Sequence, residues 1–174
     1  EALLMHDLLE RCSDPHEKLW LLNHYLDMFK GTLFRQTMFA EFEQKAHEMA
    51  AAGESMTSQS LCNIYKKLNE DYFGPGTVID PEIQYEWERI PHFYTPFYVY
   101  QYATGFSAAI AISRKIFNGE PGILEGYKKF LSGGCSDTPI ELLKLAGVDM
   151  SHTGPVEEAL KFFEELLNEF EELA

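Results

Sequence analysis

The sequence predicts an all-α fold, with a compact multi-helix array that forms a single domain over residues 1–174. Apolar residues recur at spacings of three and four through most of the chain, which is the period of an amphipathic helix. Prolines and glycines separate these stretches at positions typical of helix starts and stops. The pair Val78-Ile79 stands between turn residues, but it is too short to predict a sheet.

The first half of the chain predicts four helical stretches. Residues 2–12 form the first of them. Asp14 is the expected N-cap of a second, which starts at a proline and is closed by Glu17 in a capping box. This helix continues to about residue 52, and Gly31 either kinks it or passes without effect. Two more follow, one capped by a hydroxyl residue at 57 or 58 and one over residues 80–90.

The second half predicts a buried helix followed by shorter ones. Residues 105–117 are apolar nearly all round and rich in small residues, which favours close packing against other helices. Pro121 is expected to open a short helix, and Thr138 begins a capping box before another that stops at Gly147. The last helix begins at Pro155, and we expect its apolar stripe to dock on the core rather than form a coiled coil. That stripe is Val156, Leu160, Phe163, Leu167 and Phe170.

Charge and cysteine content narrow the classes of partner. The net charge of −14 argues against a nucleic-acid partner, because binding to phosphates depends on lysine and arginine. It also weakens attraction to an anionic membrane, and no apolar run is long enough to span a bilayer. Cys12, Cys62 and Cys135 are widely separated and odd in number, so we expect reduced thiols and a cytoplasmic location.

Residues 90–105 carry the most distinctive pattern, with four of the nine tyrosines and one of the six histidines within eleven residues. The prolines predict that one helix stops before Pro91 and that another starts at Thr95-Pro96. His92 and Tyr94 would then lie in the connection. Tyr98 and Tyr102 are four positions apart and would share one face of the new helix, near its free N–H groups.

Two interpretations of this cluster remain open from the residues alone. Tyrosine stays protonated at neutral pH, so phenols beside a helix start can donate hydrogen bonds to a carbonyl oxygen that gains negative charge. Tyrosine-rich helices also form ordinary core edges, where the ring is buried and the hydroxyl is hydrated.

Other catalytic patterns are incomplete. His16 and His47 are each followed by glutamate, but neither begins an H-E-x-x-H zinc motif. The glutamates around His47 could suggest a carboxylate-bridged dimetal bundle, yet no glutamate lies three positions before a histidine. The chain has no phosphate-binding glycine loop and no G-x-S-x-G, and Cys135 lies in a loop without an obvious base.

Three blocks resemble one known family and occur in its order. Residues 92–105, HFYTPFYVYQYATG, resemble the C-terminal signature of oligoendopeptidase F, a zinc metallopeptidase of the thimet-oligopeptidase-like family. Residues 31–43, GTLFRQTMFAEFE, resemble another stretch, as does the ending from LLKLAGVDM at 142–150 through the final helix. The resemblance implies that the chain is the C-terminal part of a larger helical metallopeptidase catalytic domain.

The resemblance also implies a zinc cofactor whose ligands lie upstream of this chain. The family's H-E-x-x-H helix and its third ligand, a glutamate, are expected in the missing N-terminal part of the polypeptide, and Glu1 resembles a later glutamate that does not bind the metal. We therefore expect residues 1–174 alone to be inactive and to bind no stoichiometric zinc.

The same resemblance implies that this chain contains the substrate-binding residues of the site. His92 would contact the backbone of an oligopeptide substrate, Tyr98 and Tyr102 would stabilise the oxyanion, and Tyr94 would be a further substrate contact. The competing hypothesis is a stand-alone helical interaction module that binds a partner through the residue 156–170 stripe. An H-E-x-x-H encoded before Glu1 would decide for the endopeptidase, and a start codon just before Glu1 would decide for the module.

Overall fold

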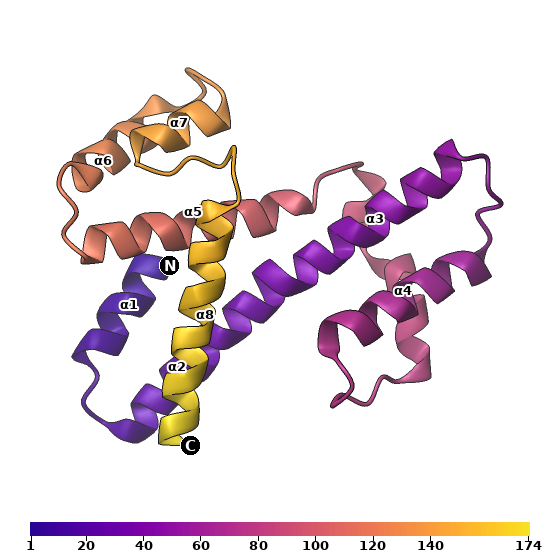
Figure 1. Ribbon diagram of the computed structural model, residues 1–174, viewed down its shortest axis with the longest axis horizontal. Coiled ribbons are helices and arrows are strands. Elements are labelled where there is room, and N and C mark those ends of the chain that lie inside the picture. The colour runs from indigo at the N-terminus through magenta and orange to yellow at the C-terminus, as the bar shows by residue number, and fades with distance from the viewer. The chain divides into compact units, whose positions relative to one another are not determined.

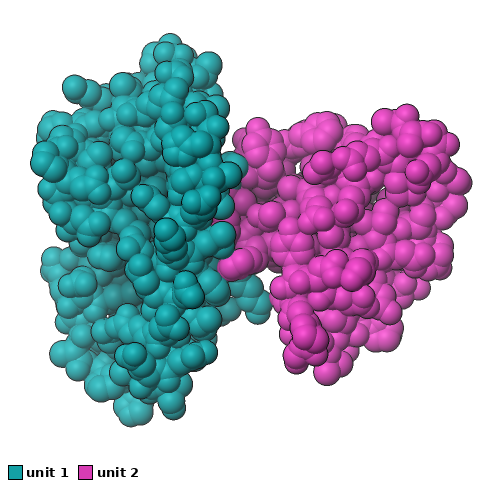
Figure 2. Space-filling model, in the orientation of Figure 1, with its two compact units in different colours: residues 1–30, 104–174 teal, residues 31–103 magenta.

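The computed structural model describes residues 1–174, and all of its regular elements are helices, which confirms the all-α prediction. The chain groups into two compact units, which Figure 2 shows in different colours: unit 1 is residues 1–30 with 104–174, and unit 2 is residues 31–103. The expected single domain stays a prediction. No helix is both long and apolar enough to cross a membrane.

The structure contains eight α-helices and three helices of other types. The α-helices are α1 (Ala2–Arg11), α2 (Pro15–Phe29), α3 (Arg35–Ala51), α4 (Ser58–Phe73), α5 (Tyr100–Phe117), α6 (Ile123–Gly133), α7 (Pro139–Leu145) and α8 (Gly154–Leu173). The others are η1 (π-helix, Lys30–Phe34), η2 (3₁₀, Pro81–Arg89) and η3 (3₁₀, Pro91–Tyr94).

Unit 1 is held together by apolar packing. Helix α2 packs against α1 and α8, and α6 packs against α7, as Figure 1 shows. Phe162 of α8 meets Tyr25 of α2 nearly edge-on, with ring centroids 5.6 Å apart. Gly126 allows the close approach of α6 and α7, because a Cβ there would lie 2.0 Å from the Leu145 carbonyl oxygen. Close packing of side chains therefore stabilises unit 1.

The buried face of α8 is centred one residue earlier than the sequence predicts. Leu160, a member of the predicted stripe, is 40% exposed. A broad apolar face leaves its exact centre undefined in the sequence, and the packing against α2 decides it. The residues that are buried are Pro155, Ala159, Phe162 and Leu166.

Unit 2 combines an aromatic core with a buried carboxylate. Its core packs α3 against α4, and the buried members are Met38, Phe39, Phe42, Tyr65, Leu68, Ile90 and Val99. Glu86 of η2 is 8% exposed and accepts hydrogen bonds from Tyr65, Arg35 and Arg89. Burial by itself would raise the pKa of Glu86, but the hydrogen bonds from Tyr65 and Arg35 and the charges of both arginines outweigh it and lower the pKa. This carboxylate fixes η2 on the core.

The capping signals of the sequence are mostly confirmed. The Asp14 carboxylate accepts from two backbone N–H groups of α2, and Thr57 and Thr138 cap α4 and α7. The predicted helix over residues 15–52 contains the π-turn η1 around Gly31. The stretch over residues 80–90 is a 3₁₀-helix, and α6 starts after Gly122 rather than at Pro121.

The predicted helix start at Thr95-Pro96 is wrong, because α5 begins at Tyr100. Phe97 has a positive φ of 56°, which a right-handed helix cannot contain. Its N–H also donates to the Glu43 carboxylate instead of pointing toward open space. Tyr98 therefore precedes the helix that carries Tyr102, and the expected free N–H group at position 97 is already bonded.

Candidate functional site

His92, Tyr98 and Tyr102 form one cluster in unit 2. The His92 and Tyr98 rings are stacked with centroids 5.8 Å apart, and the Tyr102 ring stands nearly perpendicular to both at 5.5 Å. The His92 Nε2 atom lies 3.1 Å from the Tyr102 hydroxyl, and the tautomer of the imidazole decides which of them donates. The three residues are grouped as expected, but the prediction that Tyr98 and Tyr102 share one helix face is wrong, because Tyr98 precedes α5. Their roles at a substrate site stay predictions.

The backbone around the cluster explains how the side chains meet. Pro91 starts the single turn η3, which carries His92. Phe93 follows and packs into the unit 2 core, with its ring 5.2 Å from that of Phe42. Val99 is fully buried, so the chain is anchored in the core on both sides of the exposed segment between them. The aromatic anchors hold the backbone while the imidazole and the phenols stay near the surface.

One phenol of the cluster, Tyr102, has a pKa above its ordinary value. The Tyr98 hydroxyl raises the pKa of Tyr102 through a hydrogen bond between the two side chains, and burial has a smaller effect in the same direction. Tyr98 is 39% exposed and Tyr102 is partly buried. Two neutral O–H donors beside an imidazole can bind an oxygen that carries developing negative charge.

Tyr94 stands apart from this cluster. Its side chain is 84% exposed at the end of η3, with Thr95 as the capping residue. A side chain in this position is open to a ligand at the surface. Its predicted role as a substrate contact stays a prediction.

Sequence reasoning missed Glu43, which the fold brings to the connection between η3 and α5. This glutamate of α3 is 6% exposed, and its Oε1 atom accepts from the Phe97 N–H at 2.7 Å. A glutamate on a helix ordinarily lies in solvent, so the pattern around it indicated a solvated charge. The positive φ of Phe97 would have indicated that this N–H needs a partner outside a helix, and only the structure reveals it.

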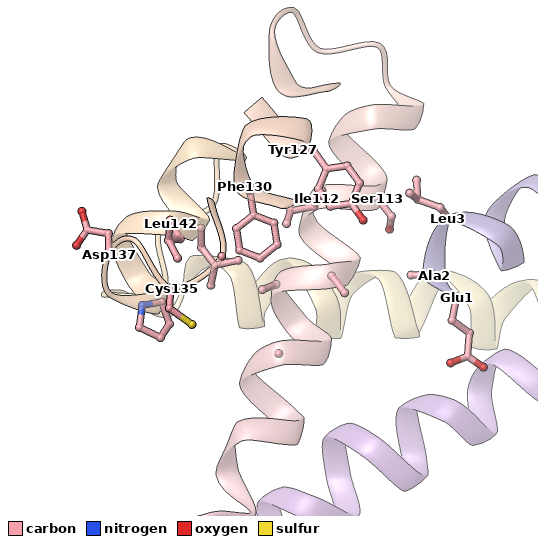
Figure 3. A pocket seen from close by; sticks show the side chains of 16 residues that line it. Glu1, Ala2, Leu3, Ile112, Ser113, Tyr127, Phe130, Cys135, Asp137 and Leu142 are labelled. Atoms are coloured by element: carbon pink, nitrogen blue, oxygen red, sulfur yellow. The ribbon is translucent and has the colours of Figure 1, made fainter. Parts of the chain in front are cut away.

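A separate apolar cavity of about 710 Å³ lies within unit 1. Figure 3 shows Tyr127 and Phe130 of α6 on one side, Ile112 of α5 beside them and Leu142 of α7 on another wall. Cys135 is exposed in the loop after α6, which also contributes to the lining. Apolar carbon dominates these walls, and the carboxylates of Glu1 and Asp137 also contribute to the lining.

The residues of this chain do not fit a zinc site. Within residues 1–174, no group of three or more histidine, cysteine, aspartate or glutamate side chains converges on one point. A catalytic zinc ion takes three protein ligands and keeps one position open. Residues 1–174 alone therefore do not supply the ligand set of a catalytic zinc ion.

Comparison with known proteins places this helical chain among the peptidases. The model of peptidase family M3 matches residues 1–162, and the chain belongs to that family. It is 54% identical to "Oligopeptidase PepF" of Bacillus subtilis, covering 99% of this chain and 26% of that protein. It is 49% identical to "Oligoendopeptidase F, chromosomal" of Lactococcus lactis, covering 99% of this chain and 29% of that protein.

A solved structure supports the same family assignment. The chain matches the crystal structure of oligoendopeptidase-F from Enterococcus faecium with a TM-score of 0.95 and 53% identity, over 98% of this chain and 33% of that one. The resemblance read from the three sequence blocks is thereby confirmed. The chain spans between about a quarter and a third of the length of these relatives.

Proposed function

We propose that residues 1–174 form the C-terminal, substrate-binding and oxyanion-stabilising part of a cytoplasmic zinc-dependent endopeptidase that hydrolyses short peptides. The observation that carries this proposal is the His92, Tyr98 and Tyr102 cluster in a chain of peptidase family M3. The zinc ligands lie, in this proposal, in the part of the enzyme upstream of residue 1. The oligopeptide lies against the cluster, and residues 1–174 alone are inactive.

Each residue of the cluster has a role that its chemistry supports. Tyr98 and Tyr102 donate hydrogen bonds to the carbonyl oxygen of the scissile bond as that oxygen gains negative charge. His92 bonds the peptide backbone next to that carbonyl and orients the Tyr102 hydroxyl through their 3.1 Å contact. Tyr94, exposed nearby in the chain, contacts the substrate further from the reacting bond.

The test is Tyr98→Phe in the complete endopeptidase. Loss of a hydrogen-bond donor that acts only in the transition state should lower kcat by about a hundredfold while KM stays similar. Tyr85→Phe is the matched control, because Tyr85 is an exposed phenol of η2 in the same unit and should keep the parental kcat. Parental turnover in Tyr98→Phe would remove Tyr98 from the oxyanion role.

The hypothesis of a stand-alone interaction module predicts a different coding sequence before Glu1. Sequencing the coding region before Glu1 separates the two hypotheses. An upstream H-E-x-x-H supports the endopeptidase, because that motif supplies two histidine ligands and a general base. A start codon immediately before Glu1 supports the module.

A further inference from the structure

Phe97 has a backbone conformation that its residue type disfavours. Its φ of 56° is the only positive value at a non-glycine residue of the chain. A bulky side chain in this region clashes with its own backbone, so such a conformation persists only where the surroundings enforce it. Phe97 directly precedes Tyr98, the phenol that stacks on His92. Whatever enforces this φ also sets the direction in which the chain enters Tyr98.

Two residues of α3, one helical turn apart, hold Phe97. The Glu43 Oε1 atom accepts the Phe97 N–H at 2.7 Å, which is a short hydrogen bond for an N–H donor. The His47 ring lies against the Phe97 ring with centroids 4.6 Å apart. The Phe97 ring is 55% exposed, so burial of that ring does not fix the residue. The carboxylate is therefore the main restraint on this backbone.

The position of the anchor matters because Phe97 is the residue through which the chain enters Tyr98. The Tyr98 ring is 39% exposed and meets His92 and Tyr102 by stacking and edge contacts. Val99, the next residue, is fully buried, and Tyr98 lies between it and the bonded Phe97. If Phe97 relaxed to a negative φ, the peptide on its carboxyl side would turn and carry the Tyr98 ring away from His92 and Tyr102. Displacement of a catalytic donor by about 1 Å can cost on the order of a hundredfold in rate.

We propose that Glu43 is a positioning residue, which places the Tyr98 hydroxyl by holding Phe97 in its positive-φ conformation through the backbone N–H. This inference rests on the proposed function of the cluster and goes one step beyond it. Glu43 itself does not touch the substrate. Its carboxylate acts through the backbone, and the His47 ring supports the same residue from the next turn of α3.

The test compares Glu43→Gln with Glu43→Asp in the complete endopeptidase. Glutamine keeps the length of the side chain and an oxygen acceptor but loses the charge, whereas aspartate keeps the charge and loses the reach. Positioning predicts that Glu43→Gln retains most of the parental kcat and that Glu43→Asp lowers kcat by about ten- to a hundredfold, with a smaller change in KM. An electrostatic role of the charge predicts the reverse order.

Hydrogen exchange provides a readout that does not depend on turnover. In Glu43→Asp the Phe97 amide should exchange at least about tenfold faster than in the parent, because its hydrogen bond is lost. The NMR signals of the His92 ring should shift in the same variant, and both should stay near parental in Glu43→Gln. Glu41→Asp is the matched control, since Glu41 of the same helix binds Tyr72 and Lys45 instead of this connection. It should change none of the three measurements.

The outcomes separate this inference from the proposed function. If Tyr98→Phe lowers kcat but Glu43→Asp and Glu43→Gln behave alike, the positioning role is wrong and the function of the cluster stands. If turnover does not respond to Tyr98, the proposed function fails, and the exchange and ring signals still decide whether Glu43 places the cluster. A lower melting temperature in Glu43→Asp with parental kcat, exchange and His92 signals also overturns the inference.

Discussion

Two fully buried tyrosines, one in each unit, show how differently the units are stabilised. Tyr25 of unit 1 and Tyr65 of unit 2 are both 0% exposed. The Tyr65 hydroxyl donates to Glu86 at 2.7 Å, whereas the Tyr25 hydroxyl has no hydrogen-bond partner. Burial raises the pKa of both, and for Tyr65 the hydrogen bond to Glu86 raises it further. In unit 1 the buried Tyr25 contributes only the packing of its ring, whereas in unit 2 the buried Tyr65 also contributes a hydrogen bond from its hydroxyl.

The same difference extends to charge. The buried charged residues of the chain are Glu43 and Glu86, and both belong to unit 2. A buried carboxylate is destabilising unless donors satisfy it, so each of these holds a specific partner in a specific direction. Unit 2 also carries the His92 cluster. Unit 2 therefore combines its apolar core with hydrogen bonds to buried carboxylates, whereas unit 1 buries no charged side chain.

The largest effect on stability is expected from Glu86→Ala. The substitution leaves the buried Tyr65 hydroxyl without an acceptor, and Arg35 and Arg89 lose their shared partner. We expect a loss of about 1–3 kcal/mol in the free energy of unfolding, because a buried donor left unsatisfied costs that much. Urea unfolding at pH 7 measures it. A loss within experimental error would mean that unit 2 does not depend on its buried carboxylate.

Removing each phenol in turn sharpens the comparison between the units. Tyr65→Phe should lower the free energy of unfolding by about 1 kcal/mol, since Glu86 loses a donor. Tyr25→Phe should leave it unchanged or raise it by up to about 1 kcal/mol, because an unpaired buried hydroxyl is lost. The two variants are measured by the same urea unfolding assay. Equal losses would contradict the distinction drawn between the two phenols.

The smallest effect is expected in the response to acid. The pKa of Glu86 is lower in the folded chain than its ordinary value of 4.5, so its stabilisation is complete above pH 4.5 and is lost as pH falls through the folded pKa. Glu86→Gln lacks this titration, and its free energy of unfolding should fall less steeply below pH 4.5 than that of the parent. Urea unfolding at several pH values between 7 and 3 gives both curves. Parallel curves would show that Glu86 titrates alike in the folded and unfolded states.

Much of the fold could be predicted from local chemistry. Asp14 caps α2 because a carboxylate before a proline satisfies the N–H groups of a helix start, and Gly147 follows α7 because glycine accepts its φ of 75°. The three cysteines are free thiols, as expected from their spacing. The grouping of His92 with two tyrosines was also predictable, because those residues are close in sequence.

The remaining differences arise where distant residues act on the backbone. Thr95-Pro96 has the composition of a helix start, but Glu43, more than fifty positions earlier in the chain, takes the Phe97 N–H that such a helix would present. The face of α8 shifts by one residue because packing against α2 selects among neighbouring apolar positions. In both cases a local preference of modest size is overruled by a tertiary contact.

The sequence by itself determined the helical class and most helix boundaries, which follow from periodicity and capping chemistry. Through the resemblance of three blocks it also indicated the family and the residues of the candidate site. Only the tertiary structure decided that Tyr98 stands outside the helix of Tyr102, that Glu43 is buried against Phe97 and that Glu86 joins Tyr65 to two arginines. The physical reason is that a hydrogen bond between residues far apart in the chain leaves no periodic trace in either segment. Such bonds are satisfied only when the fold has brought donor and acceptor together.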